Sequence, residues 1–312
     1  MLSIYLDQNK WIDLARADHH RPNGEQFEKT LDLALKAVAV GSVCFPLSAM
    51  HYSETLNTGN DNGRRSRLAS TMMKLSRFKT LVDPFVMGEE ELRSALRTRF
   101  GDGVAVRHIP PIGEGSGYAF QQSGPPDYLS MQTLLGFDGW LEFERMKLAG
   151  ETMQSWDEPA RVFREFANTH VQRTEAVDRA FEGNSKSERH KFLWFHETEQ
   201  LLERCIEILA EDNVGPEHKP NPDWIISLLD DLPLLCAKHH MLMSIYNNRQ
   251  IPREASNFGD IGGLPQAVVT CDYVVTEKQW VRVLAQAGLG KRFGTTLLSD
   301  VRDLVPVLSP LT

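Results

Sequence analysis

The sequence has few cysteines, no long apolar run and no excess of positive charge. Its four cysteines among 312 residues form no CxxC pair, which excludes a zinc ribbon and is typical of a reducing compartment. The first residues lack the basic and apolar segments of a signal peptide. Lys238, His239 and His240 interrupt the apolar stretch at residues 233–246, well short of a membrane span. We therefore expect a cytoplasmic protein with no membrane partner.

The formal net charge of −8 argues against coating of nucleic acid through bulk positive charge. It does not exclude a nuclease, because a cluster of metal-binding carboxylates itself makes the count negative. Contact with nucleic acid would then depend on local basic patches. The densest basic segment is residues 64–78, where Arg64, Arg65 and Arg67 are predicted to bind phosphates, with a solvated helix face as the alternative.

Short apolar runs alternate with amphipathic segments at both ends of the chain. The predicted strands are residues 3–6, 42–47, 80–83, 273–276 and 295–298. The predicted helices are a segment after residue 7 and residues 25–40, 49–57, 64–78, 231–248, 261–269 and 277–288. This alternation favours an α/β fold with one central parallel sheet.

Residues 85–222 have a different character. A stretch rich in glycine and proline at 101–126 predicts a long loop, and charged segments predict helices near 131–147, 159–181 and 191–211. We interpret 85–222 as a large helical insertion that could contact a protein partner or a second copy. Residues 1–84 and 223–312 would then form one discontinuous domain.

Five carboxylates lie where this sheet would have its ligand-binding edge, beyond the carboxyl ends of parallel strands. Asp7 ends the first strand, and Glu54 lies about two turns into the helix after the second. Asp260 precedes an apolar helix, while Asp272 and Glu277 bracket the strand that follows it. We expect all five to converge on one edge of the sheet.

Carboxylates that converge raise one another's pKa unless a cation neutralises them. Hard oxygen ligands with open water positions suit Mg²⁺ or Mn²⁺, which can activate water and stabilise the charge on a phosphodiester. The pattern predicts a hydrolase in which Asp7, Glu54, Asp260 and Glu277 are catalytic metal ligands and Asp272 is a further metal ligand. The structural alternative for each is a helix cap or a surface carboxylate.

Three segments resemble PIN-like domain nucleases. Residues 4–11, Ile-Tyr-Leu-Asp-Gln-Asn-Lys-Trp, are similar to the opening strand of that family, where an aspartate ends the strand. Residues 48–54, Ser-Ala-Met-His-Tyr-Ser-Glu, are similar to its second element, which leads into a helix with an inward glutamate. Residues 260–277 resemble the family's aspartate that opens a small-residue helix, followed by an apolar strand ending in threonine and a second acid.

The resemblance implies a three-layer α/β/α PIN-like fold, a divalent metal at the acidic cluster, and hydrolysis of RNA or, less often, DNA. It covers about the first 85 and the last 85 residues. Glu277 directly follows Thr276, where many family members have an aspartate one position later, so the last acidic ligand is either Asp272 or Glu277. The helix after Asp260 also departs from the family in containing Pro265 and two glycines.

Asn9, Thr276 and Lys278 lie beside these acids and are candidates for binding substrate phosphates; for Asn9 and Thr276, supporting a ligand or capping a turn are the alternatives. His51, one turn before Glu54, is predicted to pack its helix. The leading hypothesis is a metal-dependent PIN-like endonuclease acting on RNA, with DNA as the alternative substrate. The competing hypotheses are a PIN-like module that binds RNA or protein without cleavage, and a phosphatase of small phosphate esters.

Overall fold

The computed structural model describes most of the chain. The described residues are 1–57, 61–120, 128–152, 165, 168–169, 171–172, 175–176, 179, 185–214, 224, 227–228, 231–248 and 255–312. Most of the helix predicted at 159–181 lies outside them.

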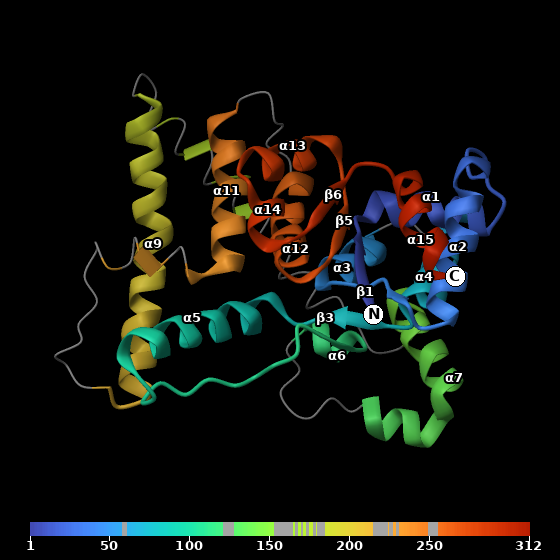
Figure 1. Ribbon diagram of the computed structural model, residues 1–312, viewed down its shortest axis with the longest axis horizontal. Coiled ribbons are helices and arrows are strands. Elements are labelled where there is room, and N and C mark those ends of the chain that lie inside the picture. The colour runs from blue at the N-terminus through green and yellow to red at the C-terminus, as the bar shows by residue number, and fades with distance from the viewer. Residues whose placement is uncertain are drawn as a thin grey trace.

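A four-stranded parallel sheet forms the centre of the molecule, with the strand order β2-β1-β5-β6 (Figure 1). Its strands are β1 (Leu2–Leu6), β2 (Val43–Cys44), β5 (Tyr273–Val275) and β6 (Thr296–Leu298). Strands from the two ends of the chain are neighbours, because Ile4 is in register with Tyr273 and Leu6 with Val275. The predicted mixed α/β class and central parallel sheet are confirmed.

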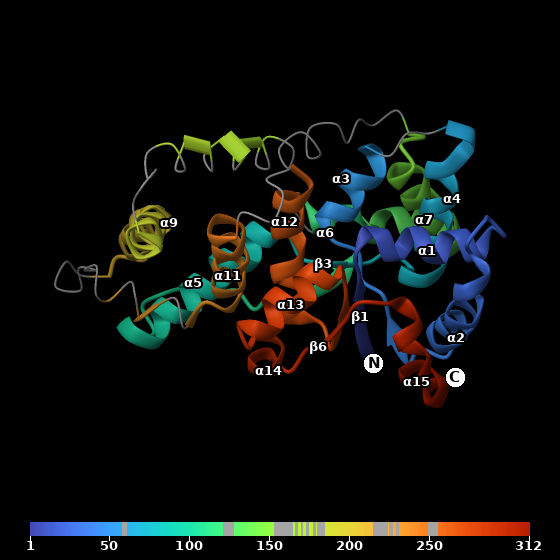
Figure 2. The ribbon, with the colours of Figure 1, turned by 90° about the horizontal axis from the view of Figure 1, so that it is seen from above.

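Helices cover both faces of this sheet (Figure 2). Side chains alternate across a strand, so Ile4 and Leu6 face one core while Tyr5 faces the other. The first core packs under α1 (Gln8–Asp18), α2 (Glu28–Ala39) and α4 (Arg64–Ser76). The second packs under α11 (Pro233–Asn247), α12 (Ala255–Thr270) and α13 (Lys278–Gln286). Burial on both faces explains why these strands read as continuous apolar runs.

The described residues contain further helices. The longer ones are α3 (Ala49–Asn57), α5 (Pro84–Phe100), α7 (Tyr128–Leu148) and α9 (Lys186–Glu211). The shorter ones are α6 (Ser116–Ala119), α14 (Leu289–Phe293), α15 (Val305–Leu308) and the 3₁₀ turns η1 (Glu25–Phe27), η2 (Asp61–Gly63), η5 (Val301–Leu304) and η6 (Ser309–Leu311). None of the helices in the described ranges combines the length and apolar character needed to cross a membrane.

The third predicted strand does not extend the parallel sheet as a full member. Strand β3 (Lys79–Leu81) pairs antiparallel with β4 (Ile112–Glu114), and a single parallel bridge joins Thr80 to Leu47. Strand β4 and helix α6 lie within the segment predicted as a long loop. The prediction needs correction at these residues, because the pairing partner of β4 is remote in sequence and leaves no local signal.

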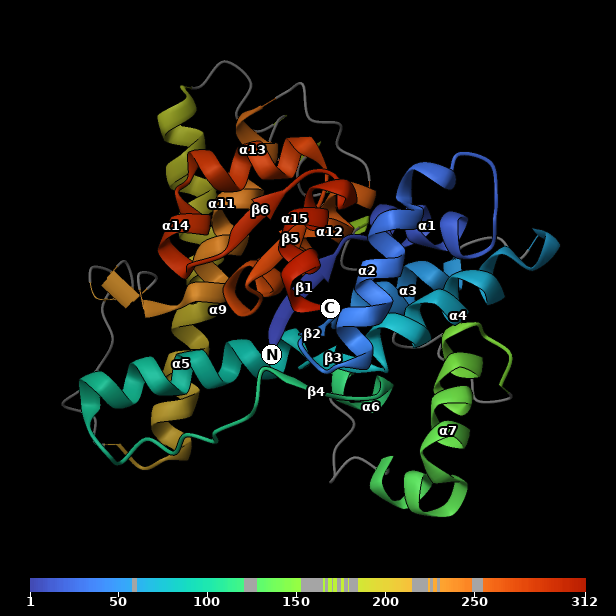
Figure 3. The same cartoon turned by 45° about the vertical axis from the view of Figure 1, so that its right-hand side comes forward.

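The predicted helical insertion is not one separate lobe. Trp140 and Leu148 of α7 are buried in the same core as Leu68 of α4, so this part of the insertion belongs to the main body (Figure 3). A separate apolar cluster joins α5 to α9, where Leu96 packs with Ile208. The boundaries 85–222 therefore need correction, because helical composition does not reveal which core a helix packs against.

Ion pairs reinforce the contact between α5 and α9. Arg93 is largely buried and forms ion pairs with Glu89 on its own helix and with Glu211 and Asp212 at the end of α9. Arg204 of α9 reaches back to Glu89 at 2.6 Å. Networks that share a buried arginine hold two elements in a fixed orientation better than isolated surface pairs do.

Candidate active site at the carboxyl edge of the sheet

Asp7 lies where β1 leaves the sheet and α1 begins. One carboxylate oxygen caps α1 by accepting the backbone N–H of Gln8 at 2.8 Å, and the other accepts the hydroxyl of Thr276 at 2.8 Å. Thr276 follows β5, the neighbouring parallel strand, and is fully buried. Capping and metal ligation are compatible, since each carboxylate oxygen retains a lone pair. The buried Thr276 hydroxyl supports Asp7, which is the alternative role considered for it, and is not exposed to a substrate.

Glu54 is positioned by the packing of α3 against β1. The His51 ring accepts the backbone N–H of Ser48 at Nδ1 (2.9 Å) and therefore donates from Nε2 to the carbonyl of Leu6 (2.7 Å). Burial lowers the pKa of His51 to about 4, so the ring is neutral and structural, as predicted. One turn further, Gln8 donates to Thr55 at 3.0 Å. These contacts fix the part of α3 that carries Glu54 beside the start of α1.

Asp260 comes from the opposite side of the sheet, on α12. A Cβ added to Gly259 would lie 3.3 Å from Met50 Cε, and one added to Gly263 would lie 3.1 Å from Tyr5 Oη. The two glycines, one helical turn apart, therefore let α12 approach β1 and α3 closely. Asp260 is the sixth residue of α12 rather than its opening residue, which corrects the predicted helix start.

Trp280 of α13 orients Asp260. The fully buried indole donates from Nε1 to the Asp260 carboxylate at 2.6 Å. A hydrogen bond from a neutral donor holds the carboxylate without cancelling its charge. Trp280 carries no sequence signal for this role, because its spacing on α13 is that of an ordinary core residue.

The three carboxylates act on one another electrostatically. Burial raises the pKa of Asp260, and the charges of Asp7 and Glu54 raise it further. Burial and the charge of Asp7 raise the pKa of Glu54 to about 8. Burial also raises the pKa of Asp7, with the Thr276 and Gln8 hydrogen bonds counteracting it in part. Residues from three remote segments thus form one acidic group.

Glu277 lies at the edge of this group, at the N-terminus of α13. The amide of the exposed Asn9 donates to the Glu277 carboxylate at 2.6 Å, linking the first turn of α1 to the start of α13. The Glu277 charge contributes to the raised pKa values of Asp7 and Asp260. Asn9 therefore supports an acidic side chain, the alternative role considered for it, and Lys278 beside it is exposed.

Asp272 is at the other end of β5, and its assignment as a metal ligand was wrong. Its carboxylate accepts the backbone N–H of Ser3 at 2.8 Å and the Ser3 hydroxyl at 2.7 Å. Ser3 precedes the residues of β1 that pair with β5, whereas Asp7 follows them. Because β1 and β5 are parallel, Asp272 lies on the amino edge, about 13 Å of strand away from the acidic group.

The predicted phosphate-binding arginines have different surroundings. Arg65 donates to the carbonyl of Leu56 at 2.7 Å and so satisfies the last turn of α3; its role as a substrate contact stays a prediction. Arg64 and Arg67 instead line a pocket between α1 and α4.

The acidic group is not a ready-made metal site. Within the described ranges, the side chains of His, Cys, Asp and Glu do not form a group of three or more that is arranged to bind a metal ion. The donor chemistry still fits a hard divalent cation, because the group consists of carboxylates whose charges oppose one another in partly buried surroundings.

Comparison with known proteins provides no family assignment. No protein-family model, no curated protein and no solved structure matches this chain.

We expect Thr276→Val to weaken divalent-metal binding and any metal-dependent activity by about 10–100-fold, the usual effect of removing a hydrogen bond that orients a ligand. The hydroxyl counteracts the effect of burial on Asp7, so its loss makes the ionised carboxylate harder to maintain. Titration of the purified protein with Mn²⁺ measures the change. Thr276→Ser keeps the hydroxyl and is the matched control; equal affinity in the valine and serine variants would contradict the role.

Proposed function

We propose that the chain is a metal-dependent nuclease with a PIN-like three-layer architecture, and that its active site is the acidic group at the carboxyl edge of the sheet. One observation carries the proposal: Asp7, Glu54 and Asp260 come from remote segments and lie so close that the charge of Asp7 raises the pKa of Glu54 and both charges raise the pKa of Asp260. Buried carboxylates that repel one another destabilise a fold, and sites of this kind are typically functional. Helices on both faces of the parallel sheet are consistent with the architecture.

Asp7, Glu54 and Asp260 would hold Mg²⁺ or Mn²⁺, with Glu277 as the outer acidic residue. A bound divalent ion would lower the pKa of a water molecule and neutralise charge that develops on a phosphodiester. Phosphodiester hydrolysis is therefore the reaction class that this donor set serves best, and RNA is the proposed substrate, with DNA as the alternative.

The remaining side chains prepare the acids for this role. Thr276 favours the ionised form of Asp7, and the Trp280 indole fixes the direction of the Asp260 carboxylate. Asn9 holds Glu277 against the first turn of α1. Both Asp7 and Glu277 lie at helix N-termini, where exposed N–H groups stabilise negative charge.

A second candidate is a PIN-like module that binds RNA or a protein without cleaving. The observation that favours it is the absence, in the described part of the chain, of a cluster already arranged to ligate an ion. The two candidates differ in one measurable property, which is turnover in the presence of a divalent metal.

The test is cleavage of labelled single-stranded RNA, structured RNA and DNA by purified protein, in Mn²⁺, in Mg²⁺ and in EDTA. A generic phosphate monoester is assayed in parallel to detect phosphatase activity. We expect EDTA-sensitive cleavage of RNA that is lost in Asp260→Asn. Tight binding of RNA without turnover in any metal would overturn the nuclease proposal and support the binding module.

Asp272→Asn is the matched control for the acidic group. The substitution removes the same charge from the same sheet but at the opposite edge, so we expect wild-type cleavage within about twofold and a small loss of stability from weaker hydrogen bonds to Ser3. Equal loss of cleavage in Asp272→Asn and Asp260→Asn would show that activity does not depend on the acidic edge. Initial rates and thermal unfolding of both variants provide the comparison.

A further inference from the structure

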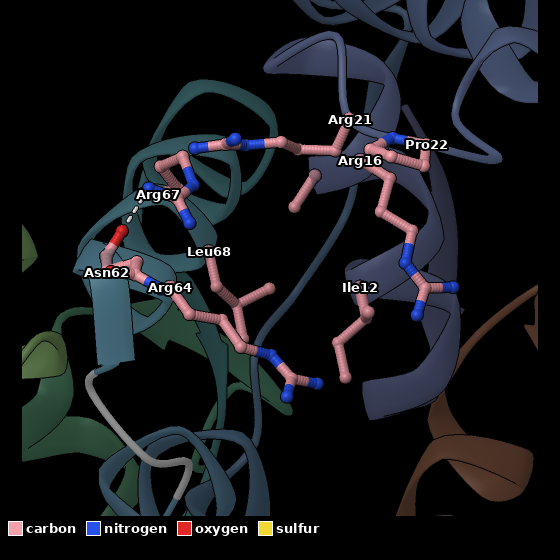
Figure 4. A pocket seen from close by; sticks show the side chains of 9 residues that line it. Ile12, Arg16, Arg21, Pro22, Asn62, Arg64, Arg67 and Leu68 are labelled. Atoms are coloured by element: carbon pink, nitrogen blue, oxygen red, sulfur yellow. Dashed lines mark hydrogen bonds between the residues drawn. The ribbon is translucent and has the colours of Figure 1, made fainter.

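A pocket of about 310 Å³ lies between α1 and α4, away from the acidic group. Figure 4 shows side chains from α1 and the loop after it on one side and from α4 on the other, with Arg21 extending toward the α4 side. Four arginines line the pocket above an apolar floor: Arg16, Arg21, Arg64 and Arg67 with Ile12 and Leu68. No acidic side chain is among its lining residues in the described part of the chain.

The positive charges of the pocket are poorly compensated. Arg16 forms an ion pair with Asp13 at 3.1 Å, and Arg67 donates to the backbone carbonyl of Asn62 at 2.6 Å. Within the described ranges, the backbone of Arg21 is hydrogen-bonded, but the guanidinium groups of Arg21 and Arg64 form no hydrogen bond or ion pair. The nearby Asp18 is already engaged by Lys74 and Thr71.

The guanidinium groups of Arg21, Arg64 and Arg67 around one small pocket repel one another, and an anion that binds among them relieves this repulsion. Guanidinium groups bind phosphate through two parallel hydrogen bonds, and two of these groups have all their donors available. A ligand carrying several negative charges at short spacing matches this arrangement better than a single carboxylate does.

The size and lining of the pocket indicate which part of a ligand it recognises. Its volume is at the small end of ligand-binding pockets, which are typically about 300–1,000 Å³. Its lining residues include no aromatic ring on which a base could stack. Recognition therefore rests on phosphates and not on a nucleobase.

The pocket is separate from the acidic group. Asp7 precedes α1, whereas Ile12 and Arg16 lie five and nine residues further along, roughly 8–14 Å at the helical rise. We propose that the pocket formed by Arg16, Arg21, Arg64 and Arg67 is a binding site for a chain of contiguous phosphates. Such a chain occurs free, as in a nucleoside triphosphate or inorganic tripolyphosphate, and at the 5′-triphosphate end of an RNA strand.

The test measures binding of tripolyphosphate by calorimetry in EDTA, so that the result does not depend on a divalent ion or on cleavage. We expect binding to the wild-type chain that weakens with salt. Arg21→Ala and Arg64→Ala should each reduce affinity about tenfold or more, because each removes charge-assisted hydrogen bonds. Arg21→Lys and Arg64→Lys keep the charge and should recover part of the affinity.

Arg282→Ala is the matched control, since Arg282 is an exposed arginine on α13 that does not line the pocket; its affinity should equal wild type. Competition by ATP and by RNA with a 5′-triphosphate or a 5′-hydroxyl end identifies the source of the phosphates. The proposal is overturned by orthophosphate binding as tightly as tripolyphosphate, by equal effects in the control and the pocket variants, or by no binding of any phosphate chain. Asp7→Asn should bind tripolyphosphate normally, so loss of cleavage and loss of pocket binding are distinguishable.

Discussion

Asp7→Asn is expected to abolish metal-dependent cleavage while making the metal-free protein more stable. Removing a residue that only supports a metal ligand costs about 10–100-fold, so loss of a ligand itself should cost at least about 100-fold. Asparagine has the same shape and still accepts the backbone N–H of Gln8. The variant removes a buried charge whose pKa is raised by burial, and a single stabilising substitution commonly adds about 0.5–2 kcal/mol to the free energy of unfolding.

Two measurements on the same samples test this expectation. Initial cleavage rates in Mn²⁺ report the loss of activity, and urea unfolding in EDTA at pH 8 reports the gain in the free energy of unfolding. A destabilised variant would show that Asp7 acts mainly as the cap of α1, since loss of a cap costs about 1 kcal/mol. Asp272→Asn, at the other edge of the sheet, is again the control and should show neither effect.

The metal-free protein is expected to lose stability as the pH rises from about 4.5 to about 8. Burial and the charge of Asp7 raise the pKa of Glu54 from 4.5 to about 8, so in this window the unfolded chain has released a proton that the folded chain retains. Stability falls with pH wherever the folded state binds more protons. For Glu54 alone the fall is up to roughly 5 kcal/mol, complete once the pH passes the folded-state pKa.

Asp7 and Asp260 act in the same direction, because burial raises the pKa of each. A divalent ion favours the ionised carboxylates, so Mn²⁺ should restore stability most strongly near pH 8 and have little effect near pH 5. Urea unfolding from pH 5 to pH 8, with EDTA and with Mn²⁺, measures both trends. Glu54→Gln should flatten the pH dependence in EDTA; an unchanged slope in this variant would contradict the assignment of the raised pKa.

The protonation of the acidic group should also control how tightly it binds a divalent ion. Near pH 8 without metal, the acidic group is under electrostatic strain, and the free energy released by neutralising it is available for ion binding. We therefore expect metal affinity to increase with pH between about 5 and 8, as protons no longer compete for Glu54 and Asp260. Mn²⁺ titrations at several pH values would reveal this competition directly.

The sheet and the main acidic positions could be predicted from local patterns. Apolar runs such as residues 3–6 mark strands, and Asp7 ends its strand in the sequence just as it does in the structure. Parallel strands have their carboxyl ends at one edge of the sheet. This rule was enough to predict that Asp7, Glu54 and Asp260 converge there. Their role as metal ligands stays a prediction.

The places where the prediction failed share one physical cause. Asp272 and Glu277 both flank β5, but only the direction of β5 relative to β1 decides that Asp272 lies at the far edge beside Ser3. Arg65 and Arg64 are adjacent in sequence, yet one satisfies a helix terminus and the other lines a pocket. A local charge pattern does not reveal which partner each side chain meets.

The sequence by itself determined the α/β class, the position of most described strands and helices, and the acids that end or follow the strands, because these depend on apolar periodicity and on neighbours within a few residues. Tertiary packing decided the rest. It brought the Trp280 indole to Asp260, let α12 approach through Gly259 and Gly263, placed α7 in the main core, and gathered four arginines at a pocket between α1 and α4. Each of these contacts joins residues that are remote along the chain, so their free energies depend on a geometry that no local pattern encodes.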